Sequence, residues 1–327
     1  MKAWRFAEFG RIENLILGDW PDPEIGEGEV LIRLKFAALN PADRLSVEGR
    51  YPGVGPLPLS VGRDGAGILE RVGPNSAFRV GDAVVILRSE IGISRQGTLA
   101  ERVAVPERSV APLPAGWTFE EGAAAPLVYL TAWKALVSQG GLTAGQTVLV
   151  DGATGGVGIA AIQLASSLGA RAVALTRDGS KHASLLSLGA GAVVDSALDG
   201  LEDRVRKALD GGGVDIAVEN LGGGYIRANL ALANPGGRIM VIGLLAGRMA
   251  QIDMGALLFK QARIEGVHVG QFAPSEAQAA WINIVETLDR CKARPLVDRV
   301  FPMAGVQEAF ARLSGGHMGK VLIGVAA

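Results

Sequence analysis

The most informative segment of the sequence is Val148-Leu149-Val150-Asp151-Gly152-Ala153-Thr154-Gly155-Gly156-Val157-Gly158. A short apolar strand leads into a glycine-rich turn, and the small and apolar residues of Ile159–Leu168 then indicate a helix. Glycines at such a turn let the backbone approach a pyrophosphate, and the N-terminus of the following helix favours negative charge. A glycine-rich turn can also be purely structural, but the strand before it and the helix after it favour a dinucleotide site. The residues predicted to line this site are Ala153, Thr154, Gly155, Gly156, Val157 and Gly158.

The turn departs from the G-x-G-x-x-G pattern at one position. Ala153 stands where the first glycine would be. Alanine tolerates a turn with an ordinary φ angle, so a Rossmann unit is still expected. The departure instead narrows the subtype of dinucleotide-binding turn.

From Thr147 onward, short apolar strands alternate with segments of helical spacing. The predicted strands are Thr147–Asp151, Arg171–Thr176, Ala192–Asp195, Val214–Glu219 and Arg238–Gly243, and the helices between them include Ile159–Leu168, Lys181–Leu188 and Leu201–Leu209. Alternation at this pitch is typical of βαβ units and predicts a parallel, doubly wound sheet.

The segments on either side of this region have a different sequence pattern. The first 120 or so residues consist of short strands punctuated by turn signals, which predicts a compact, β-rich, barrel-like domain. A helical stretch follows at Glu120–Gln139, and the tail after about Val269 is too short to fold alone. We therefore expect a discontinuous domain made of residues 1–121 and 269–327, with the Rossmann domain inserted as residues 122–268.

The end of the second Rossmann strand bears on the choice of nicotinamide cofactor. Enzymes that use NAD usually place a carboxylate there, which accepts a hydrogen bond from the ribose 2′-hydroxyl. Here Thr176 occupies the strand end, and Arg177 and Lys181 lie close by, as cations suited to a 2′-phosphate. These residues favour NADPH, although Asp178 leaves NADH possible, and the two cations can equally be solvated surface charge.

Composition excludes several classes of protein. The 32 basic residues nearly balance the 33 acidic ones, so no electrostatic affinity for nucleic acid or anionic lipid is expected. The N-terminus has no signal-peptide pattern, and no window is apolar enough for a membrane span. A single cysteine, Cys291, excludes an internal disulfide, and the cytoplasm is the expected location.

The chain resembles a known protein family along almost its whole length. It is similar to the medium-chain dehydrogenase/reductase superfamily, and within it to the zinc-independent quinone oxidoreductase and 2-enoyl thioester reductase branch. The motifs that carry the resemblance are Ala38-Leu39-Asn40-Pro41-Ala42-Asp43, Glu48-Gly49-Arg50-Tyr51-Pro52, Val61-Gly62-Arg63-Asp64-Gly65-Ala66-Gly67, Val80-Gly81-Asp82-Ala83-Val84, Thr131-Ala132-Trp133, Gly155-Gly156-Val157-Gly158 and Gly319-Lys320-Val321. The resemblance implies a GroES-like catalytic domain with an inserted Rossmann domain, an active cleft between the two, and a homodimer.

The resemblance also allows the zinc question to be addressed position by position. Zinc alcohol dehydrogenases of this superfamily carry a catalytic Cys, a His-Glu pair and a second Cys. The matching positions here hold Ala38, Arg63-Asp64 and Leu127, and the cysteine-rich lobe of the structural zinc is absent. Zinc needs three or four Cys, His or carboxylate ligands, and the three histidines are scattered, so no metal is expected.

Without zinc, a conjugated acceptor is favoured over a simple alcohol, because hydrogen bonds can hold the charge that spreads onto its oxygen. The resemblance to the enoyl thioester reductases implies that Tyr51 is the proton donor or hydrogen-bonds the substrate carbonyl, with a structural tyrosine packed on Pro52 as the alternative. Asn40 matches an asparagine that the family keeps near the nicotinamide, or is simply a turn residue. Further residues expected at the cofactor are Thr131, Gly243, Leu244 and Lys320, while Arg63 is a cation that can pair with Asp64 or Asp43 or meet an anionic substrate.

Three functions are compatible with these residues. The first is an NADPH-dependent oxidoreductase that transfers a hydride to a quinone or another α,β-unsaturated carbonyl. The second is a 2-enoyl-CoA or enoyl-ACP reductase, which predicts a groove with basic residues for a pantetheine phosphate. The third is a non-catalytic dinucleotide-binding protein.

Overall fold

The computed structural model describes residues 1–87 and 90–325, and these residues form two compact units. Unit 1 comprises Met1–Leu127, Gly270–Ile282 and Pro295–Ala327. Unit 2 comprises Val128–Val269 and Asn283–Arg294. Among the described residues, no helix is both long enough and apolar enough to cross a membrane.

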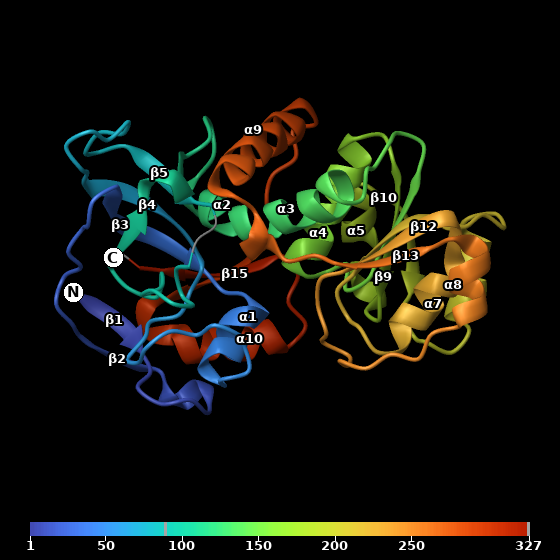
Figure 1. Ribbon diagram of the computed structural model, residues 1–327, viewed down its shortest axis with the longest axis horizontal. Helices are drawn as coiled ribbons and strands as arrows, with labels where there is room; N and C mark the ends of the chain where they lie inside the picture. Colours follow the sequence, from blue (N-terminus) through green and yellow to red (C-terminus); the bar gives the residue numbers. More distant parts are fainter. Residues whose placement is uncertain (88–89, 326–327) are drawn as a thin grey trace. The chain divides into compact units, whose positions relative to one another are not determined.

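Unit 2 is built on a six-stranded parallel sheet with the strand order β10-β9-β8-β11-β12-β13 (Figure 1). The strands are β8 (Thr147–Val150), β9 (Arg171–Thr176), β10 (Ala190–Asp195), β11 (Val214–Glu219), β12 (Ala233–Val241) and β13 (Arg263–Gly266). The helices between them are α4 (Gly156–Ser167), α5 (His182–Ser187), α6 (Leu201–Ala208), α7 (Gly224–Leu232) and α8 (Met254–Lys260). This arrangement confirms the predicted Rossmann-like fold.

The central strands of this sheet are apolar on both faces. Val148, Leu149 and Val150 of β8 are fully buried, and so is most of β9. Strands of a parallel sheet are covered by helices on both sides, and this explains why their sequences are continuous apolar runs rather than alternating ones. Helix α4 packs on β8, β9 and β10, so the element that follows the glycine turn lies directly on the centre of the sheet.

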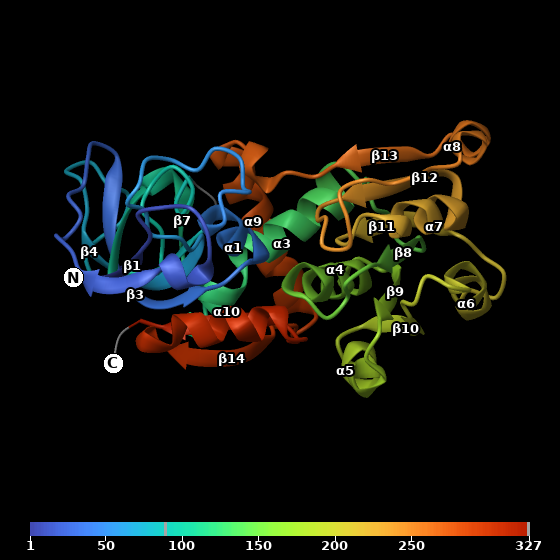
Figure 2. The same cartoon turned by 90° about the horizontal axis from the view of Figure 1, so that it is seen from below.

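Unit 1 contains a mostly antiparallel sheet with the strand order β14-β15-β3-β4-β5-β7, in which β6 also pairs with β3. Its strands are β3 (Glu29–Ala38), β4 (Asp64–Arg71), β5 (Ala83–Ile86), β6 (Arg102–Pro106), β7 (Val110–Pro112), β14 (Val297–Pro302) and β15 (Lys320–Gly324), while β1 (Lys2–Arg5) and β2 (Ile16–Asp19) form a separate hairpin-like pair. Its helices are α1 (Pro41–Val47), α2 (Phe119–Ala124) and α10 (Val306–Ser314), the last lying beside β14 (Figure 2).

The closing segment of the chain completes this sheet. Strand β15 pairs antiparallel with β3, with Leu322 opposite Ala38, and parallel with β14. Gly319 precedes β15 with φ +91, and a Cβ there would lie 2.3 Å from the carbonyl oxygen of Leu296, so only glycine fits this approach. A β-rich GroES-like unit whose sheet is closed by the C-terminal strand, with the Rossmann-like region between in sequence, confirms the predicted fold class.

The stretch Glu120–Gln139, which the sequence predicts to be helical, is helical in the structure but is not one continuous helix. The structure divides this segment into α2, α3 (Pro126–Trp133) and a π-helical turn at Lys134–Ser138. Pro126 has no N–H to donate, and its ring clashes with the carbonyl group four residues before it, so the helical hydrogen bonds are interrupted at this position. The 17-residue helix α9 (Pro274–Arg290) is close to the helix predicted at Glu276–Cys291.

Candidate functional site

The glycine turn of unit 2 has the features of a phosphate cradle. Gly152 has φ +59, a left-handed conformation that glycine adopts without strain. Gly155 is the N-cap of α4, and a glycine has no side chain with which to cap this helix end. Because the first amides of a helix have no partner within the helix, an uncapped N-terminus beside a glycine turn can bind an anionic group.

Gly158 shows why this turn tolerates no side chain at its inner position. A Cβ on Gly158 would lie 2.5 Å from the carbonyl oxygen of Gly152 and 2.7 Å from the Cα of Ala153. The helix therefore packs against the turn with no room for a methyl group, as a dinucleotide-binding turn requires. Ala153 is itself fully buried beneath it. The residues present thus fit a dinucleotide.

At the end of β9, the structure distinguishes the charged residues of the predicted cofactor site. Asp178 caps a short 3-10 turn, with its Oδ1 accepting from Ser180 N at 3.0 Å and from Ser180 Oγ at 2.6 Å. Its Oδ2 lies 3.5 Å from Lys181 Nζ. Thr176 is buried and accepts from Asp178 N, whereas Arg177 is exposed and has no ion pair among the described residues. The carboxylate is thus engaged with its own loop, while a guanidinium is available.

A buried polar cluster that the sequence analysis did not identify lies under the carboxyl ends of β8 and β11. Asn229 Nδ2 donates to Asp151 Oδ2 and to Glu219 Oε2, both at 2.6 Å, and all three side chains are fully buried. Burial first, and then the neighbouring Glu219 charge, raise the pKa of Asp151 well above its ordinary value. The only signal in the sequence was an acidic residue at the end of each strand.

This cluster holds the loops at the strand ends in place. Glu219 Oε1 accepts from the backbone N–H groups of Leu221 and Gly222, at 2.6 and 2.8 Å. The Asn220 side chain donates to the carbonyl of Asp151 at 2.7 Å. A Cβ on Gly243 would lie 2.4 Å from the carbonyl oxygen of Asn220, so the predicted cofactor residue Gly243 packs tightly on this loop.

The other predicted cofactor residues of unit 2 differ in exposure. Leu244, which follows Gly243, is half exposed, whereas Thr131 in α3 is buried. Their roles toward a cofactor stay predictions. Asn40, Tyr51 and Lys320 belong to unit 1, so the predicted site residues fall in both units.

In unit 1, Asn40 and Lys320 meet at a buried carboxylate. Lys320 Nζ donates to Asn40 Oδ1 at 2.6 Å and to Asp64 Oδ2 at 3.0 Å. Asn40 Nδ2 also donates to Asp64 Oδ2, and Leu127 N donates to Asp64 Oδ1. Lys320 is 4% exposed and Asp64 is fully buried. The ion pair is therefore shielded from water and its carboxylate accepts three hydrogen bonds.

This arrangement does not fit a zinc ion at the positions that zinc enzymes of the family use. Ala38 pairs with Asp64 across β3 and β4, and Leu127 contacts the same carboxylate, so the fold does bring these positions together. They supply a methyl group, an engaged carboxylate and an isobutyl group instead of thiolate and imidazole ligands. The Lys320 ammonium already provides the positive charge that Asp64 needs. No group of three or more metal-ligating side chains occurs among the described residues.

Tyr51 contacts Arg63, the cation that stands at one of the family's zinc-ligand positions. Arg63 Nη1 donates to the Tyr51 hydroxyl at 3.0 Å, and the guanidinium carbon lies 5.2 Å from the centroid of the tyrosine ring. Arg63 does not form an ion pair with Asp64 or Asp43, which are the two partners that the sequence suggested, within the part of the chain that the structure describes. A tyrosine hydroxyl that accepts one hydrogen bond still has its own hydrogen to donate.

The buried Asp43 carboxyl makes the stability of the fold depend on pH. Its carboxylate caps α1 by accepting from Asn40 N at 2.8 Å, and the side chain is fully buried. Burial raises the pKa of Asp43 to about 6 from its ordinary value of 3.8, against the opposing charge of Arg63 and the hydrogen bond from Asn40. The folded protein thus binds this proton more tightly than the unfolded chain does.

We therefore expect Asp43 to stabilise the fold most at low pH. Its contribution is fully present below pH 3.8 and is lost as the pH rises through about 6. Asp43→Asn keeps an acceptor for Asn40 N but cannot titrate. Between pH 4 and pH 7, the free energy of unfolding of the parent protein should fall relative to that of the variant by on the order of 2–3 kcal/mol. Urea unfolding at a series of pH values measures this, and parallel curves for the two proteins would contradict it.

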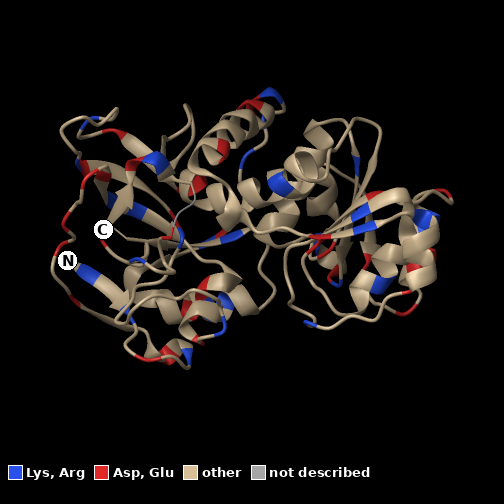
Figure 3. Ribbon diagram, in the orientation of Figure 1, with Lys and Arg blue, Asp and Glu red and all other residues tan. Residues whose placement is uncertain are grey.

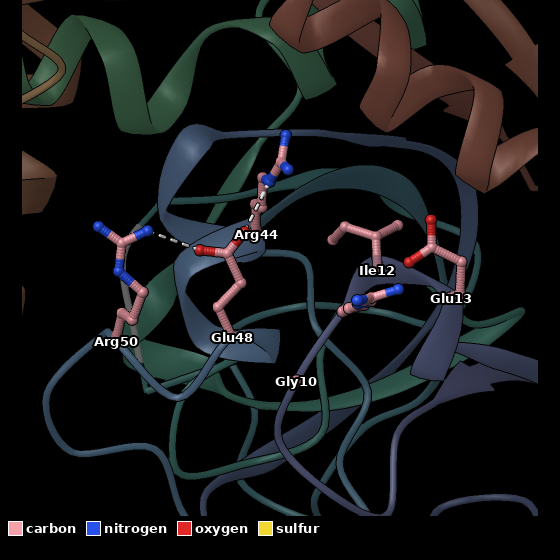
Figure 4. Close-up of a pocket in the computed structure, with 7 residues that line it drawn as sticks. Gly10, Ile12, Glu13, Arg44, Glu48 and Arg50 are labelled. Carbon is pink, nitrogen blue, oxygen red and sulfur yellow. Dashed lines mark hydrogen bonds and ion pairs between the residues drawn. The ribbon is translucent and has the colours of Figure 1, made fainter.

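A surface pocket of about 500 Å³ in unit 1 is lined by Gly10, Arg11, Ile12, Glu13, Arg44, Glu48 and Arg50. Glu48 is paired with Arg44 at 2.8 Å and with Arg50 at 2.9 Å (Figure 4). The two glutamates offset two of the three arginines, so the pocket carries little net charge. It includes none of Asn40, Tyr51 or Arg63.

Acidic and basic residues are interspersed over the whole ribbon (Figure 3).

Comparison with known proteins agrees with both units. Residues 26–115 match the family model of the alcohol dehydrogenase GroES-like domain, and residues 156–290 match that of zinc-binding dehydrogenases. The human quinone oxidoreductase is 32% identical over 99% of this chain and 97% of its own length.

Solved structures give the same result. A crystal structure of an NAD-dependent alcohol dehydrogenase superposes with a TM-score of 0.90 at 32% identity, covering 100% of both chains. A mycobacterial protein in complex with NADPH gives 0.89 at 28% identity, covering 99% of both chains.

The fold and the turn, together with these matches, define a dinucleotide-binding oxidoreductase. The chain belongs to the medium-chain dehydrogenase/reductase superfamily, in its quinone oxidoreductase branch. The family model of residues 156–290 is named for zinc, but the ligand positions described above do not suit that metal in this member.

Proposed function

We propose that the protein is a zinc-independent, NADPH-dependent reductase of quinones or other α,β-unsaturated carbonyls. The observation that carries the proposal is the buried cluster in which Lys320 and Asn40 engage Asp64, a residue at one of the positions that bind the family's catalytic metal. Without a Lewis acid at these positions, an alkoxide is poorly stabilised. A conjugated acceptor needs only hydrogen bonds to the oxygen on which charge develops. The human quinone oxidoreductase, which aligns over nearly its whole length, supports this class of substrate.

The residues divide the work between cofactor binding and acid chemistry. When bound, the reduced nicotinamide supplies a hydride. The Gly155–Gly158 turn and the N-terminus of α4 hold its phosphates, and the cluster of Asp151, Glu219 and Asn229 fixes the strand ends beside that turn. In unit 1, the Tyr51 hydroxyl donates a hydrogen bond or a proton to the substrate oxygen.

The preference for NADPH rests on the exposed guanidinium of Arg177. Asp178 already accepts two hydrogen bonds from Ser180 and pairs with Lys181, whereas Arg177 has no ion pair among the described residues. One structural neighbour is named for NAD and the other was solved with NADPH, so the two neighbours do not distinguish the cofactors. The proposed preference therefore depends on the residues at the end of β9.

Arg177→Ala is accordingly expected to raise the Kd for NADPH by about tenfold, the loss of one charge-assisted hydrogen bond, and to leave that for NADH within about twofold. Fluorescence titration with both cofactors measures this. Arg227→Ala, which removes another exposed arginine of unit 2, is the matched control. Equal weakening of both cofactors would contradict the assignment.

The substrate class is tested by NADPH oxidation with a small quinone, a simple enone and a trans-2-enoyl-CoA, with NADH in parallel. The proposal predicts turnover with the quinone or the enone, and a loss of about 10²-fold or more in kcat for Tyr51→Phe. Turnover of the thioester alone would instead establish a 2-enoyl-CoA or enoyl-ACP reductase. NADPH binding without turnover of any acceptor would favour the non-catalytic alternative.

We also propose that two copies of the chain associate through unit 2. Strand β13 is the edge of its sheet, and an exposed group of apolar side chains lies in and before α8: Leu245, Met249, Met254, Leu258 and Phe259. Exposed apolar surface and the edge strand of a sheet each favour association with a second copy. Light scattering should give twice the chain mass of 33.9 kDa, and Phe259→Asp should shift it toward the single-chain mass. A single-chain mass for the parent would refute the dimer.

A further inference from the structure

Arg63 is a buried cation whose charge acts on the buried Asp43 carboxyl but which forms no ion pair with it in the described part of the chain. It directly precedes β4, it is 7% exposed, and it has no ion pair among the described residues. Its Nε is buried and has no hydrogen-bond partner among the residues that the structure describes. Within the same residues, the hydrogen bond found for its donors is that of Nη1 to the Tyr51 hydroxyl, at 3.0 Å. A buried guanidinium is costly unless it is paired and hydrogen-bonded, so a purely structural role would predict more partners than this.

The contact with Tyr51 has a defined direction. Because arginine only donates, the tyrosine oxygen must accept, and the phenolic hydrogen must point to another group. The guanidinium also lies near the tyrosine ring, with its carbon 5.2 Å from the ring centroid. Arg63 therefore restricts both the side chain of Tyr51 and the direction in which its hydroxyl can donate.

We propose that Arg63 is the positioning residue of the reaction, holding the Tyr51 hydroxyl so that its hydrogen is presented to the substrate oxygen. This inference rests on the proposed function. Hydride addition to the conjugated acceptor places an electron pair on that oxygen. The oxygen then forms a bond to the tyrosine proton while the phenolic O–H bond breaks, leaving the electron pair of that bond on Tyr51. The adjacent guanidinium charge stabilises the resulting phenolate, and a proton from water restores the hydroxyl.

A double-mutant cycle tests the proposal, because a residue that acts through Tyr51 has no effect when Tyr51 cannot donate. In the parent protein, Arg63→Met should lower kcat by about 30-fold or more, and in the Tyr51→Phe background by less than about threefold. The Kd for NADPH should stay within about twofold throughout, and Arg63→Lys should recover part of the loss. Arg50→Met, which removes an exposed neighbour of Tyr51 that is paired with Glu48, should leave kcat unchanged.

Equal losses in both backgrounds would overturn the role of Arg63 while leaving the proposed function intact. No turnover in the parent protein would instead refute the proposed function. A second readout then still tests the contact: the carbon-13 NMR signal of the Tyr51 ring carbon that bears the hydroxyl, assigned among three tyrosines by Tyr51→Phe. It should move in Arg63→Lys and not in Arg50→Met. An unmoved signal would show that Arg63 does not hold Tyr51. Arg63→Gln replaces Arg63→Met if that variant does not fold.

Discussion

Alanine at Gly158 is expected to weaken NADPH binding by at least about 100-fold, the largest effect on ligand binding that the structure predicts for one methyl group. The added Cβ would lie 2.5 Å from the Gly152 oxygen and 2.8 Å from the carbonyl carbon of Ala153. Both neighbours are backbone, so neither can rotate away as a side chain would. The start of α4 must then move outward, and the amides that would hold the phosphates move with it. Titration of NADPH by tryptophan fluorescence measures the change.

Gly266→Ala is the matched control for this prediction. Gly266 lies in β13 of the same unit, and a Cβ built there meets no atom within 4 Å. This variant should bind NADPH like the parent protein. Normal NADPH affinity in folded Gly158→Ala would show that the turn is not the phosphate site.

Lys320→Met is expected to destabilise unit 1 by about 3–5 kcal/mol, because it leaves the buried Asp64 carboxylate without a counter-charge. Asp64 would keep its hydrogen bonds from Asn40 and Leu127, which are neutral donors. Methionine has a similar length and an apolar end, so the loss of packing is small compared with the loss of charge. Urea unfolding at pH 7 measures the change in the free energy of unfolding.

Two further variants separate charge from packing in this prediction. Adding Asp64→Asn to Lys320→Met removes the unpaired charge and should recover part of the stability. Lys2→Met breaks an exposed ion pair with Asp19, for which losses of about 1 kcal/mol or less are typical. A loss for Lys320→Met as small as that for Lys2→Met would contradict a water-shielded pair.

The parts of the fold that sequence could predict are those in which the signal is local. Strands β9 and β11 end where the apolar runs Arg171–Thr176 and Val214–Glu219 end, since a central strand is buried on both faces and its limits are set by the first polar turn. The glycine turn could be predicted for the same reason, because its glycines are close together in the sequence. By contrast, β13 has only four residues and carries charged side chains, so its apolar run is too short to stand out.

The candidate site could be predicted only in part, for the same physical reason. The Lys320–Asp64 pair joins residues that are 256 positions apart, and Asn229 bridges two strand ends that precede it by 78 and 10 positions. Nothing local to Arg63 indicates that its partner is Tyr51 rather than an adjacent aspartate. Such pairings depend on which strands become neighbours, and the sequence alone left them open.

We propose that this chain reduces a conjugated carbonyl with NADPH and without a metal. The rate of quinone reduction by NADPH tests this, measured with chelator-treated protein whose zinc content has been determined by elemental mass spectrometry. We expect full turnover in protein free of zinc and no gain when zinc is added back. Activity that appears only with bound zinc would contradict it.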